Sequence, residues 1–128
     1  TAATELAEAL GIRVAGCTYW HLVPEAIAPL LERQGGLLHA CEAETSMVWH
    51  LAPDGVRQDR LAEAVGPMST RGPGHPPGLL MRRAFSAVTA SGVIGDARLA
   101  SAAKGERLLA AICDAAAGVL ANPALWAD

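Results

Sequence analysis

The residues best suited to chemistry gather in one short stretch of the chain. It contains a histidine, a cysteine, two glutamates and two hydroxyl side chains, namely His39, Cys41, Glu42, Glu44, Thr45 and Ser46. A carboxylate can hold a divalent metal or orient a water molecule, and an imidazole can move a proton near neutral pH. This combination of residue types suits hydrolytic chemistry.

The same stretch also has a purely structural interpretation. A helix is expected to begin near Glu42, and acidic side chains in the first turn of a helix stabilise its positive end. In that case Glu42 and Glu44 are solvated, and His39 is an ordinary loop residue. A nucleophilic pair of Cys41 with His39 is a third reading, although residues two apart rarely face each other.

Two further groups could take part in chemistry. Tyr19 and Trp20 could flank a pocket, or they could cap the core at the end of a strand. Thr1 could be a nucleophile, because a free N-terminal amine can act as a base for the hydroxyl of the same residue. Otherwise Thr1 is simply where this sequence starts. His21 and His50, each beside a tryptophan, are interpreted as hydrogen-bonded structural residues.

Hydrophobic spacing and end signals predict the elements that position these groups. Helices are expected over residues 1–10, 24–34, 98–120 and from 42 onward, with one or two further helical turns within 54–65. Short apolar runs predict buried strands over residues 12–20 and 85–89, with a glycine-rich turn at 91–96 and a Gly/Pro loop at 66–78. A helix that leads into a strand is the repeating unit of an α/β sheet.

Composition narrows the class of protein. The 128 residues suffice for one domain, and 52% are hydrophobic but only 4% aromatic, so small side chains build most of the core. A net charge of -3 gives no electrostatic basis for binding nucleic acid or an anionic membrane. Three widely spaced cysteines are typical of reduced thiols, so we expect a soluble, cytoplasmic protein.

Three motifs in order resemble the creatininase family. The segment HACEAETSMVWHLAPDGVRQDR (39–60) is similar to the family stretch in which His-Ala is followed by Glu-Thr-Ser and later by Pro-x-x-Val. The segment SGVIGDARLASAAKGERLL (91–109) resembles a Gly-Val-x-Gly-Asp turn that is followed by Lys-Gly. Tyr19 and Trp20 match an aromatic pair after a short strand. The resemblance covers essentially the whole chain.

The resemblance implies an α/β fold with three layers and a central, mostly parallel sheet. Residues 1–128 would supply the C-terminal half of this single domain. The family hydrolyses carbon–nitrogen bonds of cyclic or linear amides, and some members process small precursor peptides. The implied activity is therefore a metal-dependent amidohydrolase that acts on a small amide or peptide.

The resemblance also implies roles for individual residues. His39 takes the place of the catalytic proton-transfer histidine, and Glu44 that of a carboxylate facing the metal centre. Tyr19 and Trp20 would form an aromatic wall of the substrate pocket, and Glu42 would add a carboxylate to it. The implied cofactors are two divalent ions, zinc, manganese or iron, with most ligands outside this chain. Asp96 would anchor a turn near the site.

The expected partners follow from the resemblance to only the C-terminal half of the family's domain. Family motifs that supply most metal ligands precede the segment matched here, so we expect the chain to work with an N-terminal portion, in a homo-oligomer. A start at Thr1 fits an isolated fragment, adventitious proteolysis or a programmed cut, and we favour the last as a hypothesis. Two alternatives remain open: a self-cleaved hydrolase with Thr1 as nucleophile, and a non-catalytic assembly subunit of the same fold.

Overall fold

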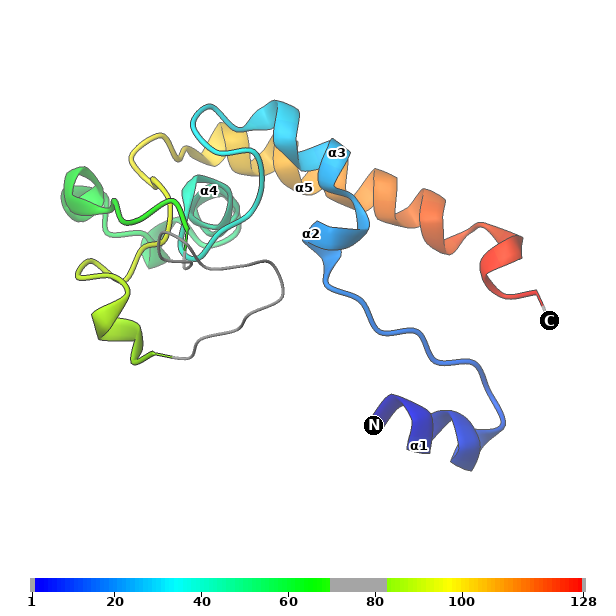
Figure 1. Ribbon diagram of the computed structural model, residues 1–128. Coiled ribbons are helices and arrows are strands. Elements are labelled where there is room, and N and C mark those ends of the chain that lie inside the picture. Colours follow the sequence, from blue (N-terminus) through cyan, green and yellow to red (C-terminus); the bar gives the residue numbers. More distant parts are fainter. Residues whose placement is uncertain (1, 70–82, 128) are drawn as a thin grey trace.

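A computed structural model describes residues 2–69 and 83–127, and helices form nearly all the regular structure in these ranges (Figure 1). The α-helices are α1 (Ala2–Leu10), α2 (Tyr19–Leu22), α3 (Pro24–Ile27), α4 (Glu42–Leu51) and α5 (Ala102–Leu120). The short 3-10 helices are η1 (Ala28–Leu30), η2 (Pro53–Gly55), η3 (Gln58–Glu63), η4 (Phe85–Ala87) and η5 (Pro123–Leu125).

The core lies where α4 crosses the N-terminal half of α5, with α2 and α3 packed on the same long helix. Its buried side chains are small or aliphatic: Val23, Ile27, Cys41, Ala43, Met47, Leu108 and Ile112. Each contributes hydrophobic stabilisation by leaving water, and the alanine and cysteine let the helices approach closely. The buried cluster thus contains no aromatic side chain, but Ile27, Met47, Leu108 and Ile112 are larger than the small side chains expected to build most of the core.

Glycine sets the distance between α4 and α5. A Cβ atom at Gly105 would overlap the carbonyl carbon and oxygen of Ser46 and lie 3.0 Å from the Cβ of His50. The backbone of α4 therefore touches the surface of α5 directly. The Ser46 hydroxyl also accepts a hydrogen bond from the backbone N–H of Ser101, at 3.1 Å, which fixes the start of α5 against α4.

A side-chain cap marks the start of α5, and a side-chain hydrogen bond to the preceding turn holds the start of α4. Ser101 adopts an extended conformation, and its hydroxyl accepts from the N–H of Lys104 at 3.2 Å, as an N-cap residue does. The carboxylate of Glu44 accepts from the N–H of Ala40, similar to the acidic half of a capping box. The predicted helices from residue 42 and over 98–120 are confirmed, the second beginning four residues later than expected.

The helix predicted over residues 24–34 is shorter than expected. Pro24 occupies its first turn, as predicted, but α3 ends at Ile27 and continues as the 3-10 helix η1. Pro29 explains the change, because proline lacks an N–H and its ring clashes with the carbonyl four residues earlier in an α-helix. The helix predicted over residues 1–10 is confirmed by α1, and η2 and η3 supply the turns predicted within 54–65.

Both predicted strands are wrong. Residues 13–18 form an extended segment without a paired neighbour, and Tyr19 and Trp20 begin α2. Phe85 begins η4, where local hydrogen bonds such as Thr89 N–H to Phe85 C=O, at 3.1 Å, replace strand pairing. In residues 2–69 and 83–127 strand pairing is limited to one antiparallel bridge, between Val65 and Asp96. A strand needs a partner to satisfy its backbone, and the expected central sheet stays a prediction.

The turn predicted at residues 91–96 is confirmed. Gly92 and Gly95 have φ angles of 83° and 108°, which residues with a Cβ rarely adopt. Buried Asp96 follows and accepts two side-chain hydrogen bonds from Arg98, at 2.9 and 2.7 Å. Those bonds, with help from the Arg98 N–H and from Arg33, outweigh burial and hold the pKa of Asp96 below its ordinary value. Asp96 thus anchors this turn as an ionised group.

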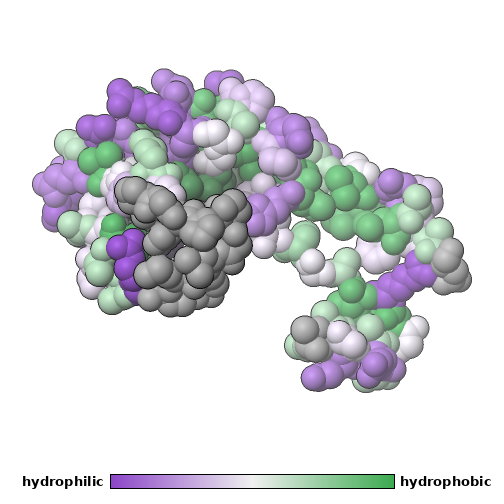
Figure 2. All heavy atoms as spheres, in the orientation of Figure 1, coloured by the Kyte–Doolittle hydropathy of each residue, from purple (hydrophilic) through white to green (hydrophobic). Residues whose placement is uncertain are grey.

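Helix α1 stands apart from the core at the end of the extended segment (Figure 1). None of its residues is buried, and Leu6 and Leu10 are 48% and 58% exposed. Leu120 and Trp126, at the far end of α5 and beyond it, are exposed as well, and Figure 2 shows hydrophobic surface on both parts. Among the described residues, no helix combines the length and hydropathy that a membrane span requires.

The Gly105 contact generates a prediction about stability. Gly105→Ala should lower the free energy of unfolding by about 1–3 kcal/mol, because the added methyl group must push α4 away from α5. Gly118→Ala is the matched control: no atom lies within 4 Å of its Cβ position, so the better helix former should raise stability by about 0.5–1 kcal/mol. Denaturant unfolding measures both variants, and equal stability of Gly105→Ala and the parent would contradict the packing described here.

Candidate functional site

The chemically able residues lie on the tight turn that enters α4 and at the start of that helix. Ala40 has a φ angle of 49°, in the left-handed region, which reverses the chain between His39 and Cys41. The carbonyl of His39 accepts from the N–H of Ile94 at 2.8 Å, and the hydroxyl of Thr45 donates to the carbonyl of Ala40 at 3.1 Å. The turn is therefore held from both sides, by the glycine-rich turn and by α4.

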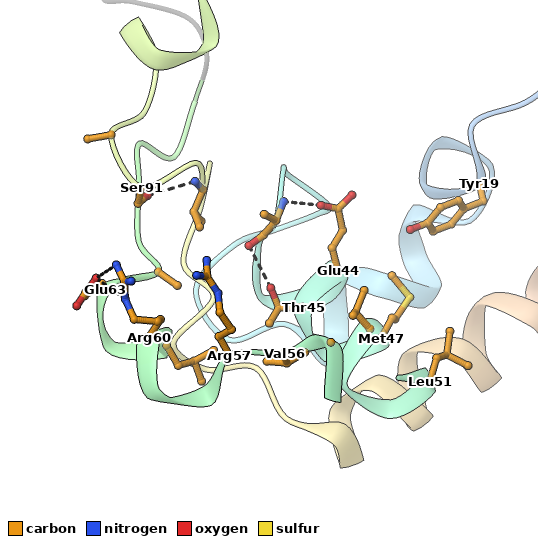
Figure 3. Close-up of a pocket in the computed structure, with 17 residues that line it drawn as sticks. Tyr19, Glu44, Thr45, Met47, Leu51, Val56, Arg57, Arg60, Glu63 and Ser91 are labelled. Atoms are coloured by element: carbon orange, nitrogen blue, oxygen red, sulfur yellow. Dashed lines mark hydrogen bonds and ion pairs between the residues drawn. The ribbon is translucent and has the colours of Figure 1, made fainter. Parts of the chain in front are cut away.

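A cavity of about 890 Å³ opens beside this turn (Figure 3). Its walls come from α4, from η3, from the 90–93 segment and from Tyr19 of α2. Apolar side chains such as Met47, Leu51 and Val56 form much of the lining, and Glu44, Arg57 and Arg60 supply charge. A volume of this size is within the range of ligand-binding pockets, and apolar walls with a few polar groups are typical of them.

Glu44 and Tyr19 both line the cavity. The Glu44 carboxylate is half-buried and accepts from the Ala40 N–H, which fixes its position. Burial, and then the charges of Glu44 and Cys41, raise the pKa of Tyr19 above its ordinary value of 10.0. The phenol therefore keeps its proton at neutral pH and can donate a hydrogen bond into the cavity.

His39 and Trp20 lie next to the cavity walls rather than in them. The ring of His39 is exposed and meets Phe85 edge-on, with ring centres 4.9 Å apart, while the adjacent Ala40 lines the cavity. Trp20 packs edge-on against Tyr19, with ring centres 5.0 Å apart. The proton-transfer role of His39 and the substrate contact of Trp20 remain predictions.

Glu42 does not line this cavity, and its predicted contact with a substrate remains a prediction. Its side chain is fully buried, pairs with the Lys104 ammonium and accepts from the Glu32 N–H at 3.2 Å. Lys104 also reaches the Glu32 carboxylate at 2.6 Å. Burial lowers the pKa of Lys104, but the hydrogen bonds to Glu32 and Glu42 outweigh it, so the pKa is raised overall. The structure gives Glu42 a role in joining α4 to α5, two positions before the carboxylate that lines the cavity.

Sequence reasoning missed the basic side of the cavity. Arg57 and Arg60 belong to the segment whose resemblance was noted, yet no role was predicted for either. Arg60 donates to the Glu63 carboxylate at 3.0 and 2.7 Å, an exposed pair on η3. The spacing of two arginines around one turn was a usable signal, since it places both cations near one surface. Thr1, the predicted alternative nucleophile, lies outside the described residues.

The described residues do not form a metal centre by themselves. Across residues 2–69 and 83–127, no three side chains of the types His, Cys, Asp or Glu gather closely enough to hold one ion. Glu44 offers one carboxylate at the cavity wall. A metal at this place would need further ligands from other residues.

Comparison of the sequence with known proteins finds one matching family and several relatives. The family model described as creatininase (creatinine amidohydrolase) matches residues 1–120. Proteins named mycofactocin precursor peptide peptidase from Mycobacterium tuberculosis and Mycobacterium ulcerans are 38% and 36% identical over 81 residues. That segment is 62% of this chain and 30% of the length of each relative. No solved structure matches the chain.

The placement of the two glutamates generates a prediction that separates their roles. Glu42→Gln should lower the free energy of unfolding by about 3 kcal/mol, because Lys104 loses its buried counter-charge. Glu44→Gln should cost less than about 1 kcal/mol, since the amide oxygen still accepts from Ala40. Denaturant unfolding at neutral pH compares them. Replacing both members of the buried pair, in Glu42→Leu with Lys104→Met, should recover part of the loss, and equal losses for the two glutamates would contradict the assignment.

Proposed function

The chain belongs to the creatininase family, and on this basis we propose that it forms part of a hydrolase that cleaves an amide bond in a short peptide or small amide. The observation that carries the proposal is the cavity at the start of α4, with Glu44 and Tyr19 in its wall. The names of the relatives favour a peptide over a cyclic amide as substrate. The matched segment spans 30% of the length of those relatives. The activity is therefore proposed for this chain together with its N-terminal portion, which we call the assembled protein.

Amide hydrolysis needs a water molecule that attacks the carbonyl carbon and an acid that protonates the departing nitrogen. We assign the second task to His39, because histidine is the side chain that most often acts as a general acid and this one is exposed. The Tyr19 phenol can hydrogen-bond the substrate, because its raised pKa keeps it protonated. Trp20 extends the aromatic wall behind Tyr19.

Creatininase-family enzymes are generally metal-dependent. We propose that Glu44 supplies one ligand to a pair of divalent ions, zinc, manganese or iron, whose other ligands lie in an N-terminal portion of the protein. A divalent ion supplies Lewis-acid chemistry and a reactive water at neutral pH. We further propose that the assembled unit forms a homo-oligomer, a role to which the exposed apolar side chains of α1 and the C-terminal region are suited.

The role of His39 is tested by substitution. In the assembled protein, His39→Ala should lower kcat about 100-fold or more and leave KM within a few-fold, because proton transfer acts mainly in the transition state. Steady-state hydrolysis of a short peptide measures both constants. His50→Ala is the control, because His50 is also exposed and the alanine variant keeps the Cβ that lies beside Gly105 of α5. Nearly full activity in His39→Ala would refute the assigned role.

Metal removal separates the proposal from its two alternatives. Dialysis against a chelator should abolish hydrolysis, and readdition of zinc or manganese should restore it, while Thr1→Ala should remain active. Elemental analysis of the assembled protein should find about two divalent ions per copy. Activity that survives chelation and disappears in Thr1→Ala would favour the N-terminal threonine hydrolase. A protein without bound metal and without activity would favour the assembly subunit.

A further inference from the structure

The cavity carries two arginines, and only one of them has its charge balanced. Arg60 is paired with Glu63 through two hydrogen bonds to one carboxylate oxygen, and this pair raises the pKa of Arg60. Arg57 also lines the cavity, yet within residues 2–69 and 83–127 no hydrogen bond or ion pair engages its guanidinium. The cavity therefore offers one cation that is open to a ligand.

The backbone holds Arg57 in place. It follows η2 and precedes η3, and its carbonyl accepts from the N–H of Arg60 at 3.0 Å, which fixes the turn between the two short helices. In Figure 3 the Arg57 side chain extends toward the open region between Arg60 and Thr45. A guanidinium anchored at its backbone and open at its tip is suited to bind a planar anion through two parallel hydrogen bonds.

The negative charge of Glu44, which also lines the cavity, does not neutralise Arg57. The Glu44 carboxylate is occupied by the Ala40 N–H on the turn before α4, and no ion pair joins it to Arg57 in the described part of the chain. With Arg60 and Glu63 neutralising each other, the lining retains one carboxylate and one guanidinium. Apolar side chains, among them Val48, Leu51 and Val56, line the same cavity.

We propose that Arg57 binds a carboxylate of the peptide substrate while the apolar wall receives a neighbouring aliphatic side chain. This inference rests on the proposed peptide hydrolysis and adds a specificity-determining residue to it. The carboxylate comes from the C-terminus of the peptide or from an acidic side chain. In either case the anion is held at one end of the cavity, which orients the peptide relative to Glu44.

Three peptide probes separate these sources. N-acetyl-alanyl-leucine carries a terminal carboxylate, its C-terminal amide carries none, and N-acetyl-alanyl-glutamyl amide carries one on a side chain. Calorimetric binding to the assembled protein at low ionic strength should show about tenfold tighter binding of at least one acid than of the neutral amide. The acid that binds more tightly identifies the source of the carboxylate.

Variants assign the preference to one residue. Arg57→Ala should abolish the preference for the acid, and Arg57→Lys should retain part of it, because the charge remains but the paired hydrogen bonds do not. Arg107→Ala is the matched control: it removes the same charge from an exposed position on α5, outside the cavity lining. Its preference should equal that of the parent. Thermal unfolding of each variant verifies that the fold is intact.

The outcomes separate this inference from the proposed function. A preference that survives in Arg57→Ala, no preference in the parent, or no binding of any probe would overturn the inference. If the protein hydrolyses peptides but binding does not depend on Arg57, the inference is overturned and the proposed function is retained. A preference that depends on Arg57 in a protein that hydrolyses no amide would overturn the proposed function and retain the carboxylate site.

Discussion

The direct contact between α4 and the start of α5 is the constraint on which the rest of the structure depends. Gly105 leaves room for the Ser46 carbonyl, and the Ser46 hydroxyl accepts from the Ser101 N–H. Next to this contact, Lys104 reaches across to the buried carboxylate of Glu42. A close backbone approach and a buried ion pair both require a defined geometry, so together they allow little sliding of one helix along the other.

The position of the candidate site follows from this contact. Since α4 cannot shift along α5, the turn that enters α4 has a fixed place, and the left-handed Ala40 sits at its tip. The glycine-rich turn at residues 91–96 contacts the turn before α4 through the hydrogen bond from the Ile94 N–H to the His39 carbonyl. Asp96, ionised and buried against Arg98, stabilises that second turn. The chemically able residues thus lie on this turn and at the start of α4, between the 91–96 turn and the contact of α4 with α5.

The sequence was a good guide where local physics decides the outcome. Helix α5 has a serine cap, helical spacing of leucines and a terminating Asn122-Pro123, and all of these signals are readable from neighbouring residues. The apolar run at 12–20 is different, because a strand forms only when a partner strand satisfies its backbone, and no pattern within the run reveals that partner. The central sheet that the resemblance implies therefore stays a prediction.

The charged residues show why spacing did not suffice for the site. Glu42 and Glu44 look equivalent in the sequence, but side chains two residues apart on a helix point about 160° apart, so only one of them can face the cavity. Which one does so depends on Lys104, some sixty positions later in the chain. Arg57 and Arg60 differ for the same reason: Glu63 lies within reach of one and leaves the other open. Ion pairs with other residues thus decide which charged side chains of this site can contact a ligand. A charged side chain without such a pair is the one available for binding.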